Sequence, residues 1–148
     1  MIILETALDI PFNLSLLEQA ACAALELQSA DGDLTLVLTN DEQLHHLNRE
    51  YLGVDAPTDV LSFPASEMDP ETGRCYLGDI LISISRAEVQ ARVANHPLVD
   101  EVRLLVIHGV LHLLGHDHAG AKEKAKMWKA QGEILERLGL GHVKIDET

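Results

Sequence analysis

The sequence has few cysteines, no long apolar run and no leader-like N-terminus. Cys22 and Cys75 are its two cysteines and form no C-x-x-C pair, so we expect two reduced thiols without a disulfide framework. No apolar run approaches the roughly 20 residues that a spanning helix needs. The N-terminus lacks the basic and apolar regions of a signal peptide. These absences predict a cytoplasmic protein with no membrane partner.

Positive charge is scarce as well. The chain has 11 Lys+Arg against 24 Asp+Glu, for a net charge of −13, which disfavours nucleic acid because phosphate affinity comes chiefly from basic side chains. The acidity is unevenly spread, however, since residues 85 to 137 hold eight basic and seven acidic residues. Within this part, Lys122, Lys126 and Lys129 have helical spacing. They form either a basic stripe or an ordinary solvated helix face.

Aromatic residues make up only 3% of the chain. A sheet or barrel that binds RNA by stacking bases needs a platform of such side chains. We therefore do not expect a base-stacking RNA reader of that kind.

Length and periodicity predict one domain over residues 1–148. The 47% of hydrophobic residues in 148 positions is enough for a packed core. Helical and alternating patterns predict an α+β fold with a small mixed sheet and about five helices. The predicted strands lie near residues 1–4, 34–38, 60–63 and 80–84, and the helices near 13–27, 40–51, 85–94, 98–114 and 121–138. Residues 64–78 are predicted to be an irregular, exposed connection.

Two of these predictions bear directly on a site. Ser85 and Glu88 have the spacing of a capping box and predict the start of one helix. The segment from 98 to 114 is apolar on most faces, which is typical of a helix buried in the core.

Four histidines fall within eleven residues at the end of that buried helix. His108 and His112 are four residues apart and so project from one helix face. Gly115 allows the chain to turn back, which brings His118 within reach as a third ligand. Three histidines with a fourth tetrahedral position left for water are typical of a catalytic zinc site rather than a closed structural one.

The motif H-x-x-x-H-x-x-G-x-x-H has the spacing of an extended zinc-protease signature, but Gly109 stands where that signature has its glutamate base. Glycine transfers no proton, so a peptidase mechanism through this position is excluded. The pattern predicts a hydrolase with one catalytic zinc ion, no other cofactor, and no assigned general base.

Several residues of this segment keep a second interpretation. The histidines are either metal ligands or structural, hydrogen-bonded core groups. His116 is the alternative third ligand, although less chain is available for it to turn back. Asp117 either orients a ligand imidazole or caps the turn.

Three blocks of the sequence together resemble a known family. They are Leu47-Asn48-Arg49-Glu50-Tyr51 running on to Pro57-Thr58-Asp59-Val60-Leu61-Ser62-Phe63-Pro64, then Gly78-Asp79-Ile80-Leu81-Ile82-Ser83, and the histidine segment 108–118. In this combination the chain resembles the YbeY family of bacterial metal-dependent endoribonucleases, over about residues 34–138.

The resemblance implies a zinc ion held by His108, His112 and His118, and single-stranded RNA rather than DNA as substrate. It also implies work in ribosomal RNA maturation near the 3′ end of the small-subunit RNA and in ribosome quality control. Ribosomal subunits or assembly factors are the implied partners.

This chain departs from the family pattern at two positions. The family often has an arginine directly after the tyrosine of the first block, where this chain has Leu52, and Arg49 is either its substitute or a surface cation. The family also often has tyrosine where His116 stands, so His116 is either a proton shuttle or a replacement for a packing ring.

Three further polar residues of the blocks are candidates for contact with the metal site or the RNA backbone. Asp59 and Ser62 lie in the first block and Asp79 in the second. Each has a structural alternative: a turn cap, the polar face of a strand, or a partner for loop amides.

Two rival functions remain open at this point. One is a metallohydrolase of a small non-RNA substrate, which an acidic surface does not hinder. The other is a non-catalytic ribosome-assembly protein whose zinc is structural, in which case metal and folding are strongly coupled.

Overall fold

The structure is a computed structural model that describes residues 1–143. Across this range the elements follow the predicted order. They are β1 (Ile2–Thr6), α1 (Ser15–Leu27), β2 (Asp33–Thr39), α2 (Asp41–Leu52), β3 (Val60–Met68), β4 (Cys75–Ser83), α3 (Ile84–Ala94), α4 (Leu98–Leu113) and α5 (Ala121–Arg137). The predicted α+β class with five helices is confirmed.

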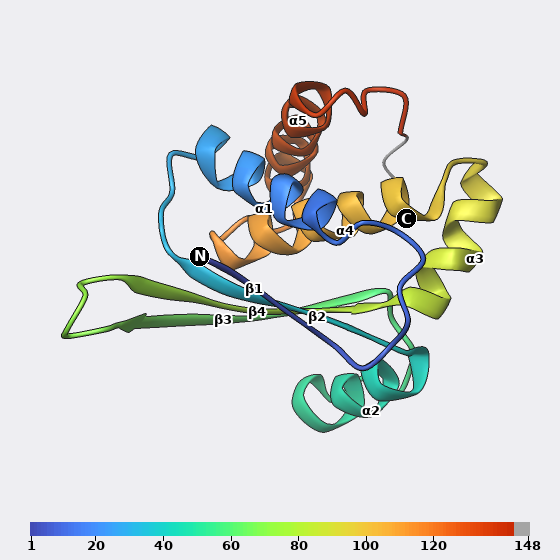
Figure 1. Ribbon diagram of the computed structural model, residues 1–148, viewed down its shortest axis with the longest axis horizontal. Helices are drawn as coiled ribbons and strands as arrows, with labels where there is room; N and C mark the ends of the chain where they lie inside the picture. The colour runs from blue at the N-terminus through green and yellow to red at the C-terminus, as the bar shows by residue number, and fades with distance from the viewer. Residues whose placement is uncertain (144–148) are drawn as a thin grey trace.

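The four strands form one mixed sheet in the order β1-β2-β4-β3. β1 pairs with β2 and β2 with β4 in parallel, whereas β3 pairs with β4 antiparallel, so the sheet is mixed as predicted. Figure 1 shows α1, α4 and α5 on one side of this sheet and α2 on the other, with α3 at one end. The helices therefore cover both faces of the sheet.

The core lies between the sheet and the α1–α4 side. Leu34, Leu36 and Leu38 of β2 are at most 2% exposed, because alternate residues of a strand point to the same face. The strand predicted near residues 34–38 is thus confirmed, with its leucines on the buried face.

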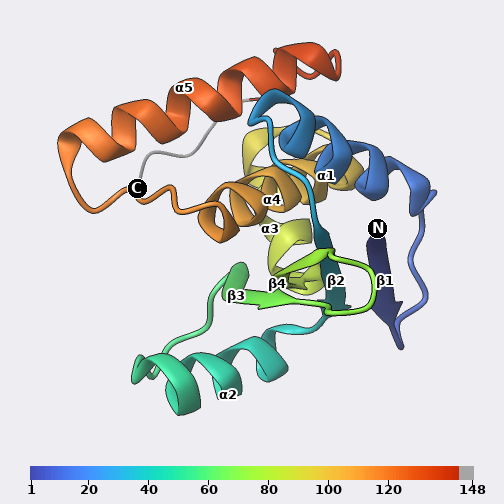
Figure 2. The ribbon, with the colours of Figure 1, turned by 90° about the vertical axis from the view of Figure 1, so that its left-hand side faces the viewer.

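α4 is the central helix of the fold. Figure 2 shows it between α5 and the sheet, and Val102, Val106 and Ile107 on it are fully buried. A helix packed on most faces holds its side chains in fixed positions. The prediction of a buried core helix carrying the histidine pair is confirmed.

The prediction that residues 64–78 form an irregular connection is wrong for most of this segment. β3 continues to Met68 and β4 starts at Cys75, with Glu67 paired to Tyr76, so only residues 69–74 connect the two strands. Most side chains in this outer part of β3 are exposed. The sequence there does not show the apolar alternation of a half-buried strand.

The cap of α3 is also two residues earlier than predicted. The Ser83 hydroxyl, not that of Ser85, accepts from the Arg86 backbone N–H at 3.1 Å. The helix follows β4 without a loop, so the last strand residue serves as the N-cap.

Among the described residues, the search for a bilayer-spanning segment finds no helix with the necessary length and apolar character.

Candidate metal centre

The three histidines of the predicted ligand set lie together at the end of α4. One nitrogen atom of each of His108, His112 and His118 lies within 4.8 Å of the other two. The Nε2 atoms of His108 and His112 are 3.0 Å apart. Two ligand nitrogens bound to one zinc at 2.0 to 2.1 Å are ~3.4 Å apart in a tetrahedral site, so small side-chain movements suffice to fit an ion.

The turn after α4 brings the third histidine back. Gly115 has a φ of +97°, a conformation that L side chains rarely adopt, and its N–H donates to the His112 carbonyl at 3.1 Å. The His116 N–H then donates to the Leu111 carbonyl at 2.9 Å. Asp117 Oδ1 accepts from the His118 N–H at 2.7 Å, so its carboxylate caps the turn.

Gln131 of α5 fixes the orientation of the first histidine. Its Oε1 accepts from His108 Nδ1 at 2.7 Å, and the Gln131 side chain is completely buried. With the proton held on Nδ1, the lone pair of His108 Nε2 points to the other two histidines. This is the arrangement in which an outer residue orients a metal ligand.

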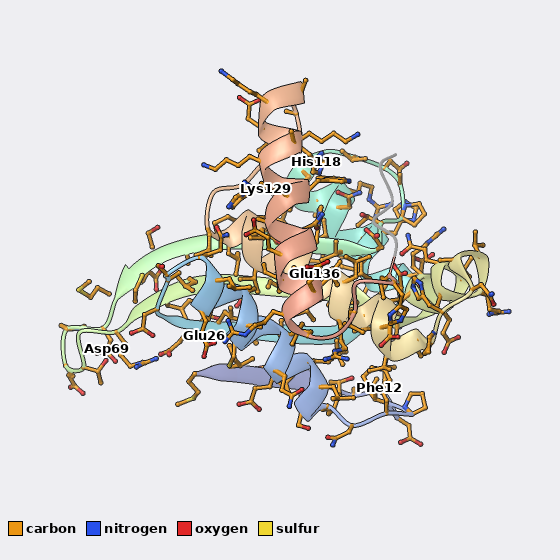
Figure 3. All side chains as sticks on the ribbon, turned by 90° about the horizontal axis from the view of Figure 1, so that it is seen from above. Phe12, Glu26, Asp69, His118, Lys129 and Glu136 are labelled. Atoms are coloured by element: carbon orange, nitrogen blue, oxygen red, sulfur yellow. The ribbon has the colours of Figure 1, made fainter. Side chains whose placement is uncertain are left out.

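Trp128, also on α5, stands edge-on against the cluster. Its ring centroid is 6.1 Å from that of His108 and 5.9 Å from that of His118. Lys124 Nζ lies 5.4 Å from the Trp128 centroid on the next turn of the helix. In Figure 3, which looks onto α5, His118 lies beside this helix. Trp128 therefore forms an apolar wall beside the histidines.

The environment keeps two of the imidazoles neutral. Burial lowers the pKa of His108, against the opposing effect of its bond to Gln131. Burial, followed by the charges of His108 and His118, lowers the pKa of His112 to about 4. At neutral pH both rings are therefore in the unprotonated form that binds metal ions.

The residue between the two helical histidines has no room for a side chain. A Cβ on Gly109 would lie 2.6 Å from Cγ2 of Ile80 in β4, and the Gly109 carbonyl accepts from the Ser62 hydroxyl at 3.3 Å. Position 109 thus faces the sheet rather than the histidines. The geometry agrees with the sequence argument against a glutamate base at this position.

A cavity of about 980 Å³ is lined by the three histidines and continues along α4. Its lining from α4 has helical spacing: Glu101, Leu104, Leu105, His108 and His112. The other walls come from α3, α5, the start of β3 and the end of α2. Residues of these walls include Leu52, Asp59, Ser62, Arg86, Val89, Gln90, Val93, Trp128 and Gln131.

The other residues singled out in the sequence fall in different places. Asp59 lines the cavity and accepts from Gln90 Nε2 at 3.2 Å. Asp79 instead accepts from the Tyr76 hydroxyl and does not line the cavity. Arg49 is exposed, with Nη2 3.4 Å from His46 Nδ1, and is also outside the cavity lining.

His116 is not part of the cluster. Its Nε2 lies 2.7 Å from Oε1 of Gln28, at the end of α1. This contact ties the turn after α4 to a neighbouring helix. His118, rather than the alternative His116, is the histidine that the fold brings to His108 and His112.

Sequence reasoning missed several residues of the cavity, among them Arg86, Gln90, Trp128 and Gln131. None of them stands in a motif. The only available signal was spacing, since Trp128 and Gln131 are three apart and so share a face of one helix.

Three imidazoles that line one cavity, on an α+β scaffold, could hold a metal ion in the arrangement found in hydrolases. The family model described as endoribonuclease YbeY matches residues 8–139. The chain therefore belongs to this family of endoribonucleases, and the predicted resemblance is confirmed.

Curated relatives named endoribonuclease YbeY match most of the chain. One from Pelotomaculum thermopropionicum is 46% identical over 126 residues, covering 80% of this chain and 83% of the relative. One from Brevibacillus brevis is 39% identical, covering 85% and 87%. One from Chloroflexus aurantiacus is 44% identical over 148 residues, covering 93% and 96%.

A solved structure is similar over nearly its full length. The solution structure of TM1509 from Thermotoga maritima aligns with a TM-score of 0.60 and 26% identity, covering 99% of this chain and 97% of that one.

Proposed function

We propose that this chain is a zinc-dependent endoribonuclease specific for single-stranded RNA, with His108, His112 and His118 as its metal ligands. The observation that carries the proposal is the convergence of three imidazole nitrogens within 4.8 Å of one another in the lining of a cavity. The relatives' name gives the reaction class. Residues 1–148 form one such metallohydrolase domain, of which residues 144–148 lie outside the described part.

The donor set suits zinc. Histidine nitrogen is among its preferred ligands, and three protein ligands are usual for a catalytic ion. When bound, zinc supplies a Lewis acid that polarises a phosphoryl oxygen and stabilises the charge formed there.

The chain's own residues position the reaction. Gln131 holds the proton of His108 on Nδ1, which directs Nε2 to the ion, and Trp128 shields one side of the ligands from water. Asp59 and Ser62 lie in the wall of the cavity in which the RNA strand would be bound. No residue is assigned as the general base.

The biological role is ribosomal RNA maturation at the 3′ end of the small-subunit RNA, together with ribosome quality control. Ribosomal subunits or assembly factors are the proposed partners, and the cytoplasm is the proposed location. Family membership supports this role.

Metal content and RNA cleavage test the proposal together. The purified protein should hold one zinc per chain and cut a labelled single-stranded RNA but not the same sequence in a duplex. His112→Ala should lose both metal and cleavage. His116→Ala is the matched control, because His116 is in the same segment but bonded to Gln28, and it should retain one zinc.

Two outcomes would count against the proposal. Equal cleavage by metal-free protein would remove zinc from the reaction. Hydrolysis of small esters or amides with no cleavage of RNA would favour the small-substrate metallohydrolase.

A further inference from the structure

The cavity extends well beyond the histidines. Along α4 its lining runs from His112 through His108 to Glu101, and with a rise of 1.5 Å per residue Glu101 lies ~10 Å from His108 along the helix axis. A single phosphodiester at the metal centre does not fill this length. The cavity therefore has room for a part of the strand that flanks the reacting bond.

Among the described residues that line the cavity, Arg86 is the only lysine or arginine. It lies in the first turn of α3, and about a third of its side chain is exposed (35%). Two carboxylates, Asp59 and Glu101, line the same space. An RNA strand in this cavity has one permanent positive charge available to it.

Both carboxylates already have partners. Asp59 accepts from Gln90 at 3.2 Å, and Glu101 pairs with His96 at 2.7 Å where both side chains are less than a tenth exposed. These partners hold the two carboxylates in place.

Arg86 has hydrogen-bonding capacity left over. Its Nε and Nη2 atoms donate to Asp41 at 3.3 and 2.8 Å, and the hydrogen bonds of the described residues involve neither hydrogen of Nη1. A guanidinium has five N–H donors in a fixed plane. One edge of Arg86 is therefore anchored by Asp41, while another can donate to an oxyanion.

The surroundings of Arg86 suit a nucleotide. Val89 and Val93 follow it at helical spacing along the cavity wall and are exposed by 50% and 84%. These two exposed apolar side chains match the flat face of a base.

We propose that Arg86 binds a backbone phosphate of the RNA strand in the part of the cavity that α3 lines. This phosphate is one or more nucleotides from the phosphodiester bond that is held at the histidines. The inference rests on the proposed function, since it names how that substrate is held. Arg86 is a binding residue and takes no part in bond cleavage.

Salt dependence of binding is the test, because each phosphate neutralised on a single strand contributes about 0.7 to the slope of log K against log salt. Zinc-loaded protein is titrated into a fluorescent single-stranded 2′-O-methyl oligonucleotide at several KCl concentrations, and a gel checks that the strand stays intact. Arg86→Gln should bind about tenfold more weakly, with a slope reduced by about 0.7. Arg86→Lys should keep the slope.

Two control variants separate a phosphate contact from a structural role. Arg92→Gln removes the other arginine of α3, which does not line the cavity, and should leave affinity and slope unchanged. Asp41→Asn breaks the same ion pair but keeps the guanidinium, and should bind at least as well as wild type. Thermal unfolding verifies that each variant is folded.

The inference fails if Arg86→Gln keeps the wild-type slope of log K against log salt. It also fails if Asp41→Asn binds the oligonucleotide as weakly as Arg86→Gln. In both cases a wild-type protein that still cuts RNA leaves the proposed function standing. A wild-type protein that neither binds nor cuts RNA overturns the proposed function as well.

Discussion

His108 and Gln131 are joined by a 2.7 Å hydrogen bond from Nδ1 to Oε1 that links α4 to α5. The two residues are 23 positions apart, and Gln131 is completely buried. The orientation of one metal ligand thus depends on a helix that contributes no ligand itself.

Gln131→Ala should weaken zinc binding by about 10- to 100-fold, as is typical when a residue that orients a metal ligand is lost. Competition with a chromophoric chelator measures the dissociation constant. Gln28→Ala is the matched control, since it removes a glutamine that makes a 2.7 Å contact with His116 instead. Equal zinc affinity in Gln131→Ala and wild type would show that the bond does not position the ligand.

Two glycine-to-alanine changes should move stability in opposite directions. At Gly109 the new methyl group meets Ile80 at 2.6 Å, so we expect a loss of about 1 to 3 kcal/mol from overpacking. At Gly132, inside α5, nothing lies within 4 Å, so helix propensity should add about 1 kcal/mol. Urea unfolding of both variants measures the two free energies, and a stable Gly109→Ala would contradict the close packing of α4 on β4.

Stability should fall at low pH through Asp33. Hydrogen bonding to Arg74 lowers the pKa of Asp33 from 3.8 to about 2 in the folded protein. A carboxylate with a lowered folded-state pKa stabilises the fold above its unfolded pKa, and this contribution disappears as the pH falls from about 4 to about 2.

The wild type should therefore be more stable than Asp33→Asn at pH 7, and the gap between their urea midpoints should close below about pH 4. Asp31→Asn is the control, because Asp31 is 96% exposed and 4.0 Å from Arg74. A gap between wild type and Asp33→Asn that is the same at pH 7 and pH 2.5 would contradict the ion pair.

Removal of the metal should leave the protein folded. The ligand-bearing helix α4 is packed by apolar residues on most faces, so its position does not depend on an ion. Chelated protein should keep its far-UV circular dichroism and a cooperative melt, with a loss near the ~2.7 kcal/mol that a ligand at 100 times its dissociation constant provides. Complete unfolding on chelation would instead support the ribosome-assembly protein with structural zinc.

The order of the elements was predictable because most of them carry strong local patterns. Leu34, Leu36 and Leu38 alternate, and Asn40 accepts from the Gln43 N–H at 2.9 Å as its capping position suggests. The outer half of the hairpin was missed because residues such as Glu67 and Met68 are exposed there, and an exposed strand needs no apolar alternation.

The candidate site was predictable where its residues are close in sequence. The helical spacing of His108 and His112 and the glycine before His118 are visible in the chain, and the structure brings the three together. Metal binding by them stays a prediction. Arg86 and Gln131 were missed because they reach the site only when α3 and α5 pack against α4, and no local pattern records tertiary packing.

β3 is an edge strand of the sheet, and its first residues also form part of the cavity wall. Its pairing with β4 is irregular between Pro64 and Glu67, and a proline and a bulge are features that discourage a further strand from joining an open edge. Self-association of two chains through this edge is thereby disfavoured. Because the start of β3 lines the cavity, an edge that resists pairing also leaves this wall uncovered by a second chain.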